Sequence, residues 1–523
     1  MKFIQTVLSI ALLSILPGTL ALGQISGVVF EDENGNGVRD AGEAGVRDVI
    51  VSNQFEVTTT NRRGQYKLPV HDEMVVFVTK PAGYSLPVNE KNLPQFYYIH
   101  QPEGSPDENF KYKGVEPTGE LPETIDFPLI PIEEPNTYDV VVFTDPQPTD
   151  HQDVSFIRDD VVAELVDSDA AFGIVLGDIM NDDLSLFDRY NSIIAKIGIP
   201  FFNVPGNHDM NYRSSNDKYS LETYKRHFGP PYYAFEYGDV HFLVLDDVVW
   251  YNPEDDDGYY EGGLGETQLS WLESHLKEVD DDKLVVVNVH IPLVSHADGD
   301  HEMNMQDGEQ LWEILSSRER LLALAGHYHM VEHSDVDANY NWTDHAPFEH
   351  MTLSAVSGSW WIGPEDERGI PITDQRDGTP NGYHIFTFDG NEYSQYLKPA
   401  KFGKDFQMRI SQPRGILSNS ELTDLPLVVN VFNANGDWDV QYKLNDGEYQ
   451  PLSQVTMTDP YIERIYTEMQ EFADSWVEPR PSTHMFTTDL PGDLPVGVHA
   501  ITVKAADEYG NEFKASRIIE IEE

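Results

Sequence analysis

The sequence predicts an α/β core flanked on each side by an all-β module. Two observations predict this arrangement. In the middle of the 523-residue chain, short apolar runs alternate with amphipathic helical patterns, which indicates a sheet covered by helices. Towards both ends, short alternating segments are separated by Gly- and Asn-rich turns, which is typical of β-sandwiches. Because one hydrophobic core cannot serve a chain of this length, we expect a leader (1–23), an N-terminal β-sandwich (24–132), an α/β domain (133–398) and a C-terminal β-sandwich (399–523).

The leader has the features of a secretory signal peptide. Lys2 is followed by an apolar segment over residues 7–16, by Pro17, and by the small-residue end Ala21-Leu22-Gly23. A membrane anchor is the weaker interpretation, because the apolar run is far shorter than the ~20 residues that span a bilayer. We therefore expect an exported protein, periplasmic or extracellular at the cell surface. The chain has no Cys, so disulfides are excluded.

The formal net charge is −56, from 90 acidic and 34 basic residues. This charge argues against nucleic acid as a partner, because the phosphate backbone is also anionic. It would repel any anionic substrate as well, unless divalent cations reverse the local field. The even spread of acidic residues fits a protein adapted to high salt, where self-repulsion is screened, and equally an ordinary acidic exported protein. No feature of the sequence indicates an oligomeric state.

The N-terminal module is expected to contain strands near residues 27–30, 46–52, 55–60 and 65–69, with residues 131–135 as a linker. The C-terminal module is expected to contain strands near residues 428–432, 438–443, 498–504 and 513–521. In the middle of the chain, buried strands are expected at residues 139–143, 172–176, 201–204, 284–289 and 321–325, with a helix at 266–279. Residues 232–246 indicate a hairpin that turns at Gly238-Asp239, so the central sheet is predicted to be mixed or doubled.

One turn of the N-terminal module has the spacing of a twelve-residue EF-hand calcium loop. Its flanks are strand-like rather than helical, and the segment resembles the calcium-binding, Ig-like repeats of bacterial surface proteins. The alternative is an acidic Gly- and Asn-rich turn that binds no ion. If Ca²⁺ binds, it would stiffen a small core. Its ligands would be the side chains of Asp32, Asn34, Asn36, Asp40 and Glu43 and the carbonyl of Val38.

Polar side chains of metal-ligand type follow each predicted strand of the central region. Because sheet proteins of this kind place functional loops at strand ends, these side chains are expected to converge. Carboxylates can bridge two metals, and imidazoles and amide oxygens complete mixed shells, so the pattern indicates a pair of divalent ions and phosphate-ester chemistry. The residues are Asp145 and Gln147, Gly177-Asp178, Gly206-Asn207-His208-Asp209, His290, and Gly326-His327-Tyr328-His329.

Residues 138–388 resemble the calcineurin-like metallophosphoesterase family, which carries Asp-x-His, Gly-Asp, Gly-Asn-His-Asp/Glu, a single His and Gly-His-x-His in this order. Four of the five blocks match in full, and with its flanking modules the chain is similar to a bacterial branch that has additional N- and C-terminal β-domains. The resemblance implies a four-layer α-β-β-α core, two divalent metal ions (Mn, Fe or Zn) and hydrolysis of phosphate mono- or diesters. It assigns Asp145, Gln147 and His329 to the first ion, Asp178 to both, and Asn207, His290 and His327 to the second.

The resemblance also implies a role for His208, which would donate a hydrogen bond to the phosphate and protonate the leaving alcohol as metal-bound hydroxide attacks phosphorus. Gln147 departs from the pattern, because the family usually has His there. A Gln carbonyl ligates more weakly and prefers harder ions, which bears on the first metal site.

Two further hypotheses concern the surroundings of this site. Trp360 and Trp361 stand in a Gly/Ser-rich loop and are expected either to form a stacking wall at its mouth or to pack against the C-terminal module. The β-modules also leave open a surface or glycan-binding protein with a catalytically degenerate, metal-holding scaffold. The intact His208 and the bridging-type ligands favour the enzyme.

Overall fold

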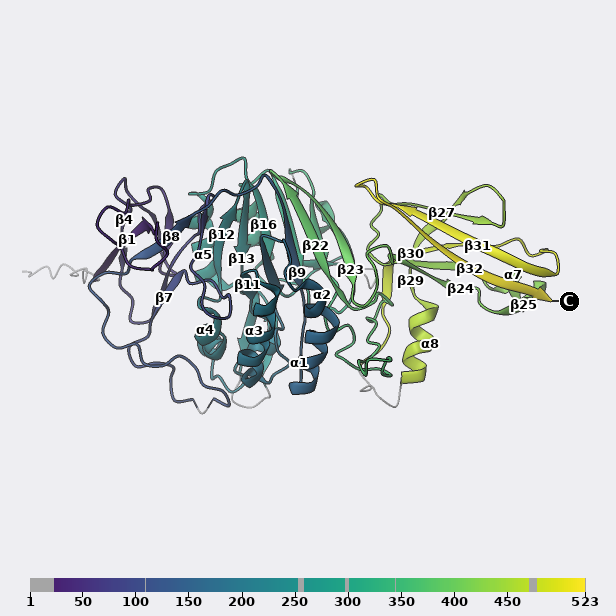
Figure 1. The fold of residues 1–523 in the computed structure, drawn as a ribbon, viewed down its shortest axis with the longest axis horizontal. Helices are drawn as coiled ribbons and strands as arrows, with labels where there is room; N and C mark the ends of the chain where they lie inside the picture. Colours follow the sequence, from purple (N-terminus) through teal and green to yellow (C-terminus); the bar gives the residue numbers. More distant parts are fainter. Residues whose placement is uncertain are drawn as a thin grey trace, which may run out of the picture.

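The computed structural model describes residues 23–108, 110–252, 258–296, 301–343, 345–469 and 477–522. Apart from Gly23, the predicted signal peptide lies outside the described residues. Figure 1 shows an elongated molecule, with the N-terminal strands (purple) at one end, a mixed α/β region in the centre and the C-terminal strands (yellow) at the other end. Among the described residues, no helix is both long and apolar enough to cross a membrane.

The N-terminal region consists of two four-stranded sheets. The alternating pattern of β1 buries every second side chain, as expected for a strand with one face in a core. One sheet has the order β4 (Gln65–Pro69), β1 (Gln24–Glu31), β8 (Phe127–Pro131) and β6 (Tyr84–Ser85). The other has the order β3 (Val57–Thr59), β2 (Ile50–Ser52), β5 (Met74–Val78) and β7 (Tyr97–His100).

The central region consists of two larger sheets that pack face to face. Their contact is aromatic: Phe172 of β10 meets Phe242 of β13 at 5.2 Å between ring centroids, and Phe202 of β11 stacks on Phe235 of β12 at 3.7 Å. The five-stranded sheet has the order β11 (Phe201–Val204), β10 (Phe172–Leu176), β9 (Thr137–Phe143), β22 (Gly382–Asp389) and β23 (Glu392–Pro399). The six-stranded sheet has the order β12 (Tyr233–Tyr237), β13 (Val240–Val244), β16 (Leu284–Asn288), β19 (Leu321–Ala325), β21 (Phe348–Thr352) and β20 (Glu332–Val336).

Helices connect the parallel strands and cover the outer faces of the two sheets, which completes the predicted four layers. The helix α5 shows why such a helix packs on a sheet. Leu269, Leu272 and Leu276 recur at helical spacing and are buried together with Trp271. The helices of this region are α1 (His151–Ile157), α2 (Ala163–Leu165), α3 (Phe187–Ile194), α4 (Glu222–Phe228), α5 (Gly265–Leu276) and α6 (Gly308–Leu315). Two small hairpins are formed by β14 (Val248–Tyr251) with β15 (Tyr259–Gly262) and by β17 (Val294–Ser295) with β18 (Glu302–Met303).

The C-terminal region has two sheets around a hydrophobic core of its own. One sheet has the order β24 (Met408–Gln412), β26 (Leu427–Val431), β30 (Pro481–Thr488) and β29 (Ser453–Thr458). The other has the order β25 (Ile416–Ser418), β32 (Glu512–Glu522), β31 (Gly497–Ala506), β27 (Asp439–Leu444) and β28 (Gln450–Pro451), and the helices are α7 (Asn419–Asp424) and α8 (Pro460–Met469).

The predicted elements of the central region are confirmed. All five predicted strands are present, the predicted helix corresponds to α5, and the predicted hairpin is the antiparallel pair β12 and β13. The sheet is both doubled and mixed, because β22 runs antiparallel to β9 whereas β10 runs parallel to it. In the expected linker, residues 131–133 and 135 are exposed, whereas the side chain of Glu134 is buried and forms a 2.7 Å ion pair with Lys80.

Candidate metal centre

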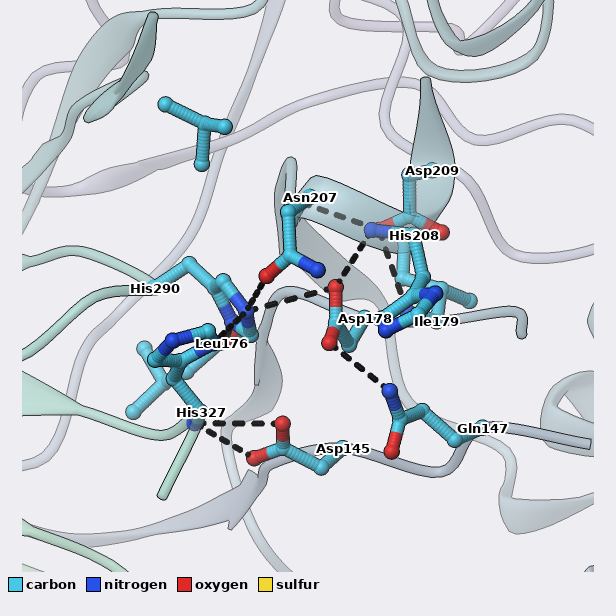
Figure 2. Close-up of polar contacts among 12 residues, drawn as sticks. Asp145, Gln147, Leu176, Asp178, Ile179, Asn207, His208, Asp209, His290 and His327 are labelled. Carbon is cyan, nitrogen blue, oxygen red and sulfur yellow. Dashed lines mark hydrogen bonds and ion pairs between the residues drawn. The ribbon is translucent and has the colours of Figure 1, made fainter. Parts of the chain in front are cut away.

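The eight residues predicted to bind metal or act in catalysis lie together at the carboxyl ends of parallel strands. β9, β10 and β11 run parallel in one sheet, and β16 and β19 run parallel in the other. The loops that follow these strands meet at one edge of the sandwich, as Figure 2 shows for seven of the eight residues. The residues are Asp145, Gln147, Asp178, Asn207, His208, His290, His327 and His329.

The ring of His290 marks one centre. Its Nδ1 lies 2.9 Å from the carbonyl oxygen of Leu176, which can only accept, so Nδ1 carries the hydrogen. In the neutral ring, which is the form that ligates metal, the lone pair of Nε2 faces the site. Nε2 lies 3.0 Å from Oδ1 of Asn207, 3.2 Å from Oδ1 of Asp178 and 3.2 Å from Nδ1 of His327 (Figure 2). Among the described residues, Asp178, His290 and His327 offer ligand atoms that all lie within 4.8 Å of one another.

The other centre, which is the predicted first metal site, lies beside it. Nδ1 of His329 donates to the carbonyl of Gly358, so its Nε2 is free to ligate and lies 3.6 Å from Oδ1 of Asp145. Gln147 donates from Nε2 to Oδ2 of Asp178 at 2.8 Å, while its Oε1 is buried and accepts no hydrogen bond from the described residues. Asp178 thus presents Oδ2 to the Gln147 group, the predicted first metal site, and Oδ1 to the His290 group, the predicted second site. A buried oxygen without a donor is what a cation site requires.

The backbone is strained at five of these positions. Asp145 (φ 46°), Gln147 (φ 38°), Asp178 (φ 48°), His327 (φ 71°) and His329 (φ 52°) all adopt left-handed conformations that residues with a Cβ rarely take. Each such residue costs about 1–3 kcal/mol, and such strain clusters at functional sites. In this conformation the chain turns sharply after each strand, and the side chain is directed back across the strand end towards the metal site.

Glycines in the motifs make room for ligands from other loops. A Cβ on Gly206 would lie 2.1 Å from the backbone nitrogen of Asp178 and 2.3 Å from its Oδ1. A Cβ on Gly177, which also has φ 80°, would lie 2.5 Å from Nδ1 of His290. Gly206 and Gly177 are therefore required, because a residue of another motif occupies the space that a Cβ would take.

The ionisation of the cluster follows from burial and mutual charge. Burial raises the pKa of Asp145. Burial would also raise the pKa of Asp178, but the charges of His290 and His208 outweigh it and hold this pKa below its usual range. Burial and the neighbouring charge of His290 lower the pKa of His327 to about 3. Burial lowers the pKa of His290, but the charge of Asp178 outweighs it and raises this pKa to about 10. Metal binding would release that proton, because imidazole ligates in its neutral form.

His208 stands apart from the ligands. It lies in the 3₁₀ turn η4 (Asn207–Asp209), lines the cavity described below, and its Nδ1 lies 2.7 Å from Oδ1 of Asp182. Burial lowers the pKa of His208, but the charges of Asp178 and Asp182 outweigh that effect and raise it to about 9. Sequence reasoning missed Asp182, although its position four residues after Asp178 was a signal.

Two buried acids support the ligands without joining them. Asp209 accepts hydrogen bonds at 3.0 Å from the backbone nitrogens of Ile179, Met180 and Gly206, so it ties the loop after β10 to the loop after β11. Asp247 accepts from the backbone nitrogen of His290 at 3.0 Å. Sequence reasoning did not single out Asp247, because it belongs to no ligand motif.

The site opens into a cavity of about 370 Å³. Trp360 lines it and stacks on His329 at 4.0 Å between ring centroids. Trp361 turns away: it is 5% exposed, donates to the carbonyl of Pro146 at 2.9 Å and packs on Phe156. Of the two predicted wall residues, only the first borders this cavity. The cavity is lined by Gln147, Asp178, His208, Tyr260, Ser295, Glu302, His327, Tyr328, His329, Met330, Trp360, Arg376 and Arg480.

The predicted calcium loop lies far from this site, between β1 and β2 of the N-terminal region. The buried carboxylate of Asp32 accepts from the backbone nitrogens of Asn36 and Gly37, at 3.1 and 2.7 Å. Oδ2 of Asp40 accepts from the amides of Asn34 and Asn36, both at 2.8 Å. Glu43 accepts from the backbone of Asp40, whereas Val38 is exposed. The loop is thus closed on itself by its predicted ligand side chains.

Comparison with known proteins agrees with this geometry. A family model described as calcineurin-like phosphoesterase matches residues 138–331. Models described as the N-terminal and C-terminal parts of calcineurin-like phosphoesterase match residues 33–115 and 349–513. All eight site residues fall within the first match.

Two individual proteins are similar over part of the chain. A probable glycerophosphodiester phosphodiesterase, GpdQ, of Arcobacter nitrofigilis is 32% identical over 160 residues, which is 29% of this chain and 52% of that protein. The chain thus spans about half the length of this curated relative. Among solved structures, the purple acid phosphatase PPD1 from yellow lupin (Lupinus luteus) seeds aligns with 67% of this chain and 66% of its own, at 14% identity and a TM-score of 0.34.

Proposed function

The chain belongs to the calcineurin-like phosphoesterase family, and on that premise we propose that it is a metal-dependent hydrolase of phosphate mono- or diesters. We propose further that it holds two divalent ions and acts after export from the cell. The family match supports the reaction class, since it covers every residue of the candidate centre. The mixture of imidazole, carboxylate and amide oxygen suits Mn, Fe or Zn.

One observation carries the proposal. Nε2 of His290, with its lone pair inward, lies within 3.2 Å of Asp178 Oδ1, Asn207 Oδ1 and His327 Nδ1. These two oxygens and two imidazole nitrogens are metal-ligand types, and a cation among them would contact all four atoms. The buried Oε1 of Gln147 and the inward Nε2 of His329 support a second ion beside Asp178. Two ions bound there would polarise the phosphate and activate a water.

Asp178 and His208 have the remaining roles in the proposed reaction. Asp178, with one oxygen turned to each group, holds the two ligand groups at a fixed separation. His208 lines the cavity and is oriented through its Nδ1 by Asp182, which leaves Nε2 as the atom for the substrate. We assign His208 to a hydrogen bond with the phosphate and to protonation of the leaving alcohol.

Export is supported by the signal-like segment at residues 1–23. It predicts that the protein recovered outside the producing cell begins near residue 24. Terminal sequencing of that protein is the test, and recovery of an intact Met1 from the cell interior would refute export.

Calcium binding in the N-terminal region is supported by the spacing of Asp32, Asn34, Asn36, Asp40 and Glu43. Because the hydrogen bonds within the loop already approximate a closed ring, the ion would replace the internal amide donors of Asp40. Titration calorimetry with Ca²⁺ on the wild type and on Asp32→Asn is the test. Equal heats for the two proteins would mean that the loop binds no ion.

The decisive experiment measures metal content and turnover on one preparation. The substrates are nitrophenyl mono- and diesters, together with glycerophosphodiesters because the similar GpdQ is named for them. They are offered with Mn²⁺, Fe²⁺ and Zn²⁺ over a range of salt. Two bound ions with turnover on at least one ester are expected. Stoichiometric metal without turnover on any ester would refute catalysis and favour the metal-holding surface protein.

A further inference from the structure

The main chain around the ligand His329 is hydrogen-bonded to one loop at two successive points. The carbonyl of His329 accepts from the backbone nitrogen of Arg376 at 3.3 Å. Two residues after the ligand, the backbone nitrogen of Val331 donates to Oδ2 of Asp377 at 2.7 Å. Arg376 and Asp377 are neighbours in the loop before β22. This loop therefore holds the backbone at the ligand itself and immediately after it.

The carboxylate of Asp377 connects that backbone to the C-terminal region. Asp377 is fully buried, and its Oδ1 accepts from the backbone nitrogen of Thr379 at 2.8 Å. Its Oδ2, which accepts from Val331, also lies 3.0 Å from Nε2 of His484. His484 belongs to β30 of the C-terminal sandwich and is buried as well. One carboxylate oxygen is thus shared between the metal loop and a strand of the C-terminal sandwich.

The ring of His484 is oriented by Asn430 of β26. The amide nitrogen of Asn430 donates to the carbonyl of Asp377 and to Oδ2 of Asp459, both at 2.9 Å. Since both of these partners are acceptors, Oδ1 is the end of the amide that faces His484, at 2.9 Å from Nδ1. The ring therefore donates to Asn430 from Nδ1 and presents Nε2 to the carboxylate of Asp377.

The other ligands of the metal centre are held by contacts within the central region. Asp209 ties the loops after β10 and β11 together, and Asp247 accepts from the backbone of His290. His327, two residues before His329, is held separately, because its backbone nitrogen donates to Oδ2 of Asp145 at 2.9 Å. The contacts of Asp377 and His484 thus bear on His329, a ligand of the first site, and not on those of the second.

We propose that Asp377 and His484 are positioning residues of the first metal site, and that the C-terminal sandwich raises the affinity of this site for its ion through them. Neither belongs to the described residues that line the cavity, so they act through the backbone of Val331. Ligating groups must be held within about 0.5 Å of their working positions, and the partners behind them supply that precision. The inference rests on the proposed two-metal function and deepens it, since it gives the C-terminal sandwich a role in metal loading.

The test measures the affinity of each site separately. Metal-free protein is titrated with Mn²⁺ against a competing chelator, and His329→Ala, which lacks a first-site ligand, identifies the affinity that belongs to the second site. His484→Ala should lower the first-site affinity by about 10–100-fold and leave the second within about twofold. Equal losses at both sites, or no loss at either, would overturn the proposal.

Conservative variants test the hydrogen bond itself. His484→Gln keeps an N–H donor that can reach Asp377, so it should lose less first-site affinity than His484→Ala. Asp377→Asn keeps the shape of the side chain but removes the carboxylate, and it should show the selective loss. These two variants also decide the matter if His484→Ala does not fold. A first-site affinity in Asp377→Asn equal to that of the wild type would contradict the positioning role.

A matched control comes from the same junction. Asn433 follows β26, and its side chain contacts His333 at 3.2 Å and Gln395 at 3.0 Å, away from the metal loop. Asn433→Ala should leave both affinities unchanged. Hydrogen exchange of the metal-free proteins gives a second measurement: residues 326–336 should exchange faster in His484→Ala and at the wild-type rate in Asn433→Ala. Equal acceleration in the two variants would indicate general loosening of the junction and refute the proposal.

Turnover of nitrophenyl esters by the same preparations separates this proposal from the proposed function. If the wild type binds both ions but hydrolyses no ester, the proposed function fails, and the affinities still decide the role of Asp377 and His484. If the wild type is active and His484→Ala binds both ions with wild-type affinity, the positioning role fails and the function stands. A wild type that binds no ion at the first site would overturn the positioning role as well.

Discussion

Nε2 of His290 lies 3.2 Å from Nδ1 of His327, and the His290 ring is fully buried. Nδ1 of His290 holds its hydrogen against the carbonyl of Leu176, so a hydrogen between the two facing nitrogens must come from His327 or from a second proton on His290. That hydrogen would have to leave before both nitrogens could ligate a metal. A metal ion satisfies both nitrogens together with the oxygens of Asp178 and Asn207, and this relationship is the basis of the predictions on metal content.

The first prediction concerns metal stoichiometry. Asp178→Asn should lose both ions, because its two oxygens face different ligand groups. His327→Ala and His329→Ala should each lose one ion, because each serves one group. Elemental analysis of the purified proteins checks this. Retention of two ions by Asp178→Asn would contradict the bridging assignment, and Glu349→Gln, which lies on β21 outside the site, serves as the control.

The second prediction concerns Gln147. Its buried Oε1 has no donor among the described residues, so it is available to the first ion. Gln147→Ala should lower the affinity for that ion by at least about tenfold, or ~1.4 kcal/mol, and leave the affinity for the second ion unchanged. Gln147→His should raise the affinity for the first ion, since imidazole is a stronger ligand for this class of metal. Competitive metal titration measures the two affinities. An equal loss of affinity for both ions would show that Gln147 does not serve one ion alone.

The third prediction concerns His208. If it protonates the leaving alcohol, His208→Gln should lower the rate on alkyl phosphates by about 10²–10⁴-fold. The rate on nitrophenyl phosphate should fall much less, because nitrophenolate leaves without a proton. Asp182→Asn should show the same pattern in weaker form, because Asp182 only orients the ring. Equal losses on both substrate classes would assign His208 to phosphate binding alone.

The fourth prediction concerns Gly206. An added Cβ would lie 2.1 Å from the backbone nitrogen of Asp178, which cannot move without displacing the bridging carboxylate. Gly206→Ala should therefore lose metal and activity. Gly403→Ala is the control, because Gly403, like Gly206, lies outside the left-handed region and nothing lies within 4 Å of an added Cβ. Metal retention by Gly206→Ala would mean that the two loops have room to separate.

The fifth prediction concerns pH and the buried His384 of β22. Its Nε2 accepts from the backbone of Ser354 at 3.2 Å, and its Nδ1 is hydrogen-bonded to Oε1 of Gln395 at 3.1 Å. Burial lowers the pKa of His384 to about 3. Since the unfolded value is about 6.5, the stability that the neutral ring contributes is complete above pH 6.5 and is lost progressively as the pH falls towards 3.

From pH 6.5 to pH 5, protonation of His384 in the unfolded state should lower the free energy of unfolding of the wild type by about 2 kcal/mol. His384→Gln keeps a donor and an acceptor but does not titrate, so the difference in unfolding free energy between the two proteins should shrink over that range. Denaturant unfolding at the two pH values measures it. A difference that stays constant would show that His384 is not the titrating group.

The sequence was sufficient to predict the ligand loops because their signals are local. An apolar run that ends in Gly177-Asp178 or Gly326-His327 indicates a buried strand followed by a turn, and parallel strands place such turns at one edge. The order of the motifs then predicted the family, and the structure brings all eight residues together.

What the sequence could not predict depends on tertiary contacts. Arg376 and Arg480 reach the cavity only because the C-terminal region docks beside His329, and no local pattern encodes that docking. Trp360 and Trp361 are neighbours with φ values of 55° and 57°, and this left-handed turn sends one ring to the cavity and the other into the core. A pattern of adjacent Trp residues carries no information on which of them does which.

One hydrophobic core is continuous from the N-terminal sheets into the catalytic sheets, where the rings of Phe77 on β5 and Trp271 on α5 pack with 6.1 Å between their centroids. Removing the N-terminal sheets would therefore expose the buried Trp271 of α5. The C-terminal sandwich has its own core and is joined to the catalytic region by buried polar contacts, such as that of His484 Nε2 with Oδ2 of Asp377 at 3.0 Å.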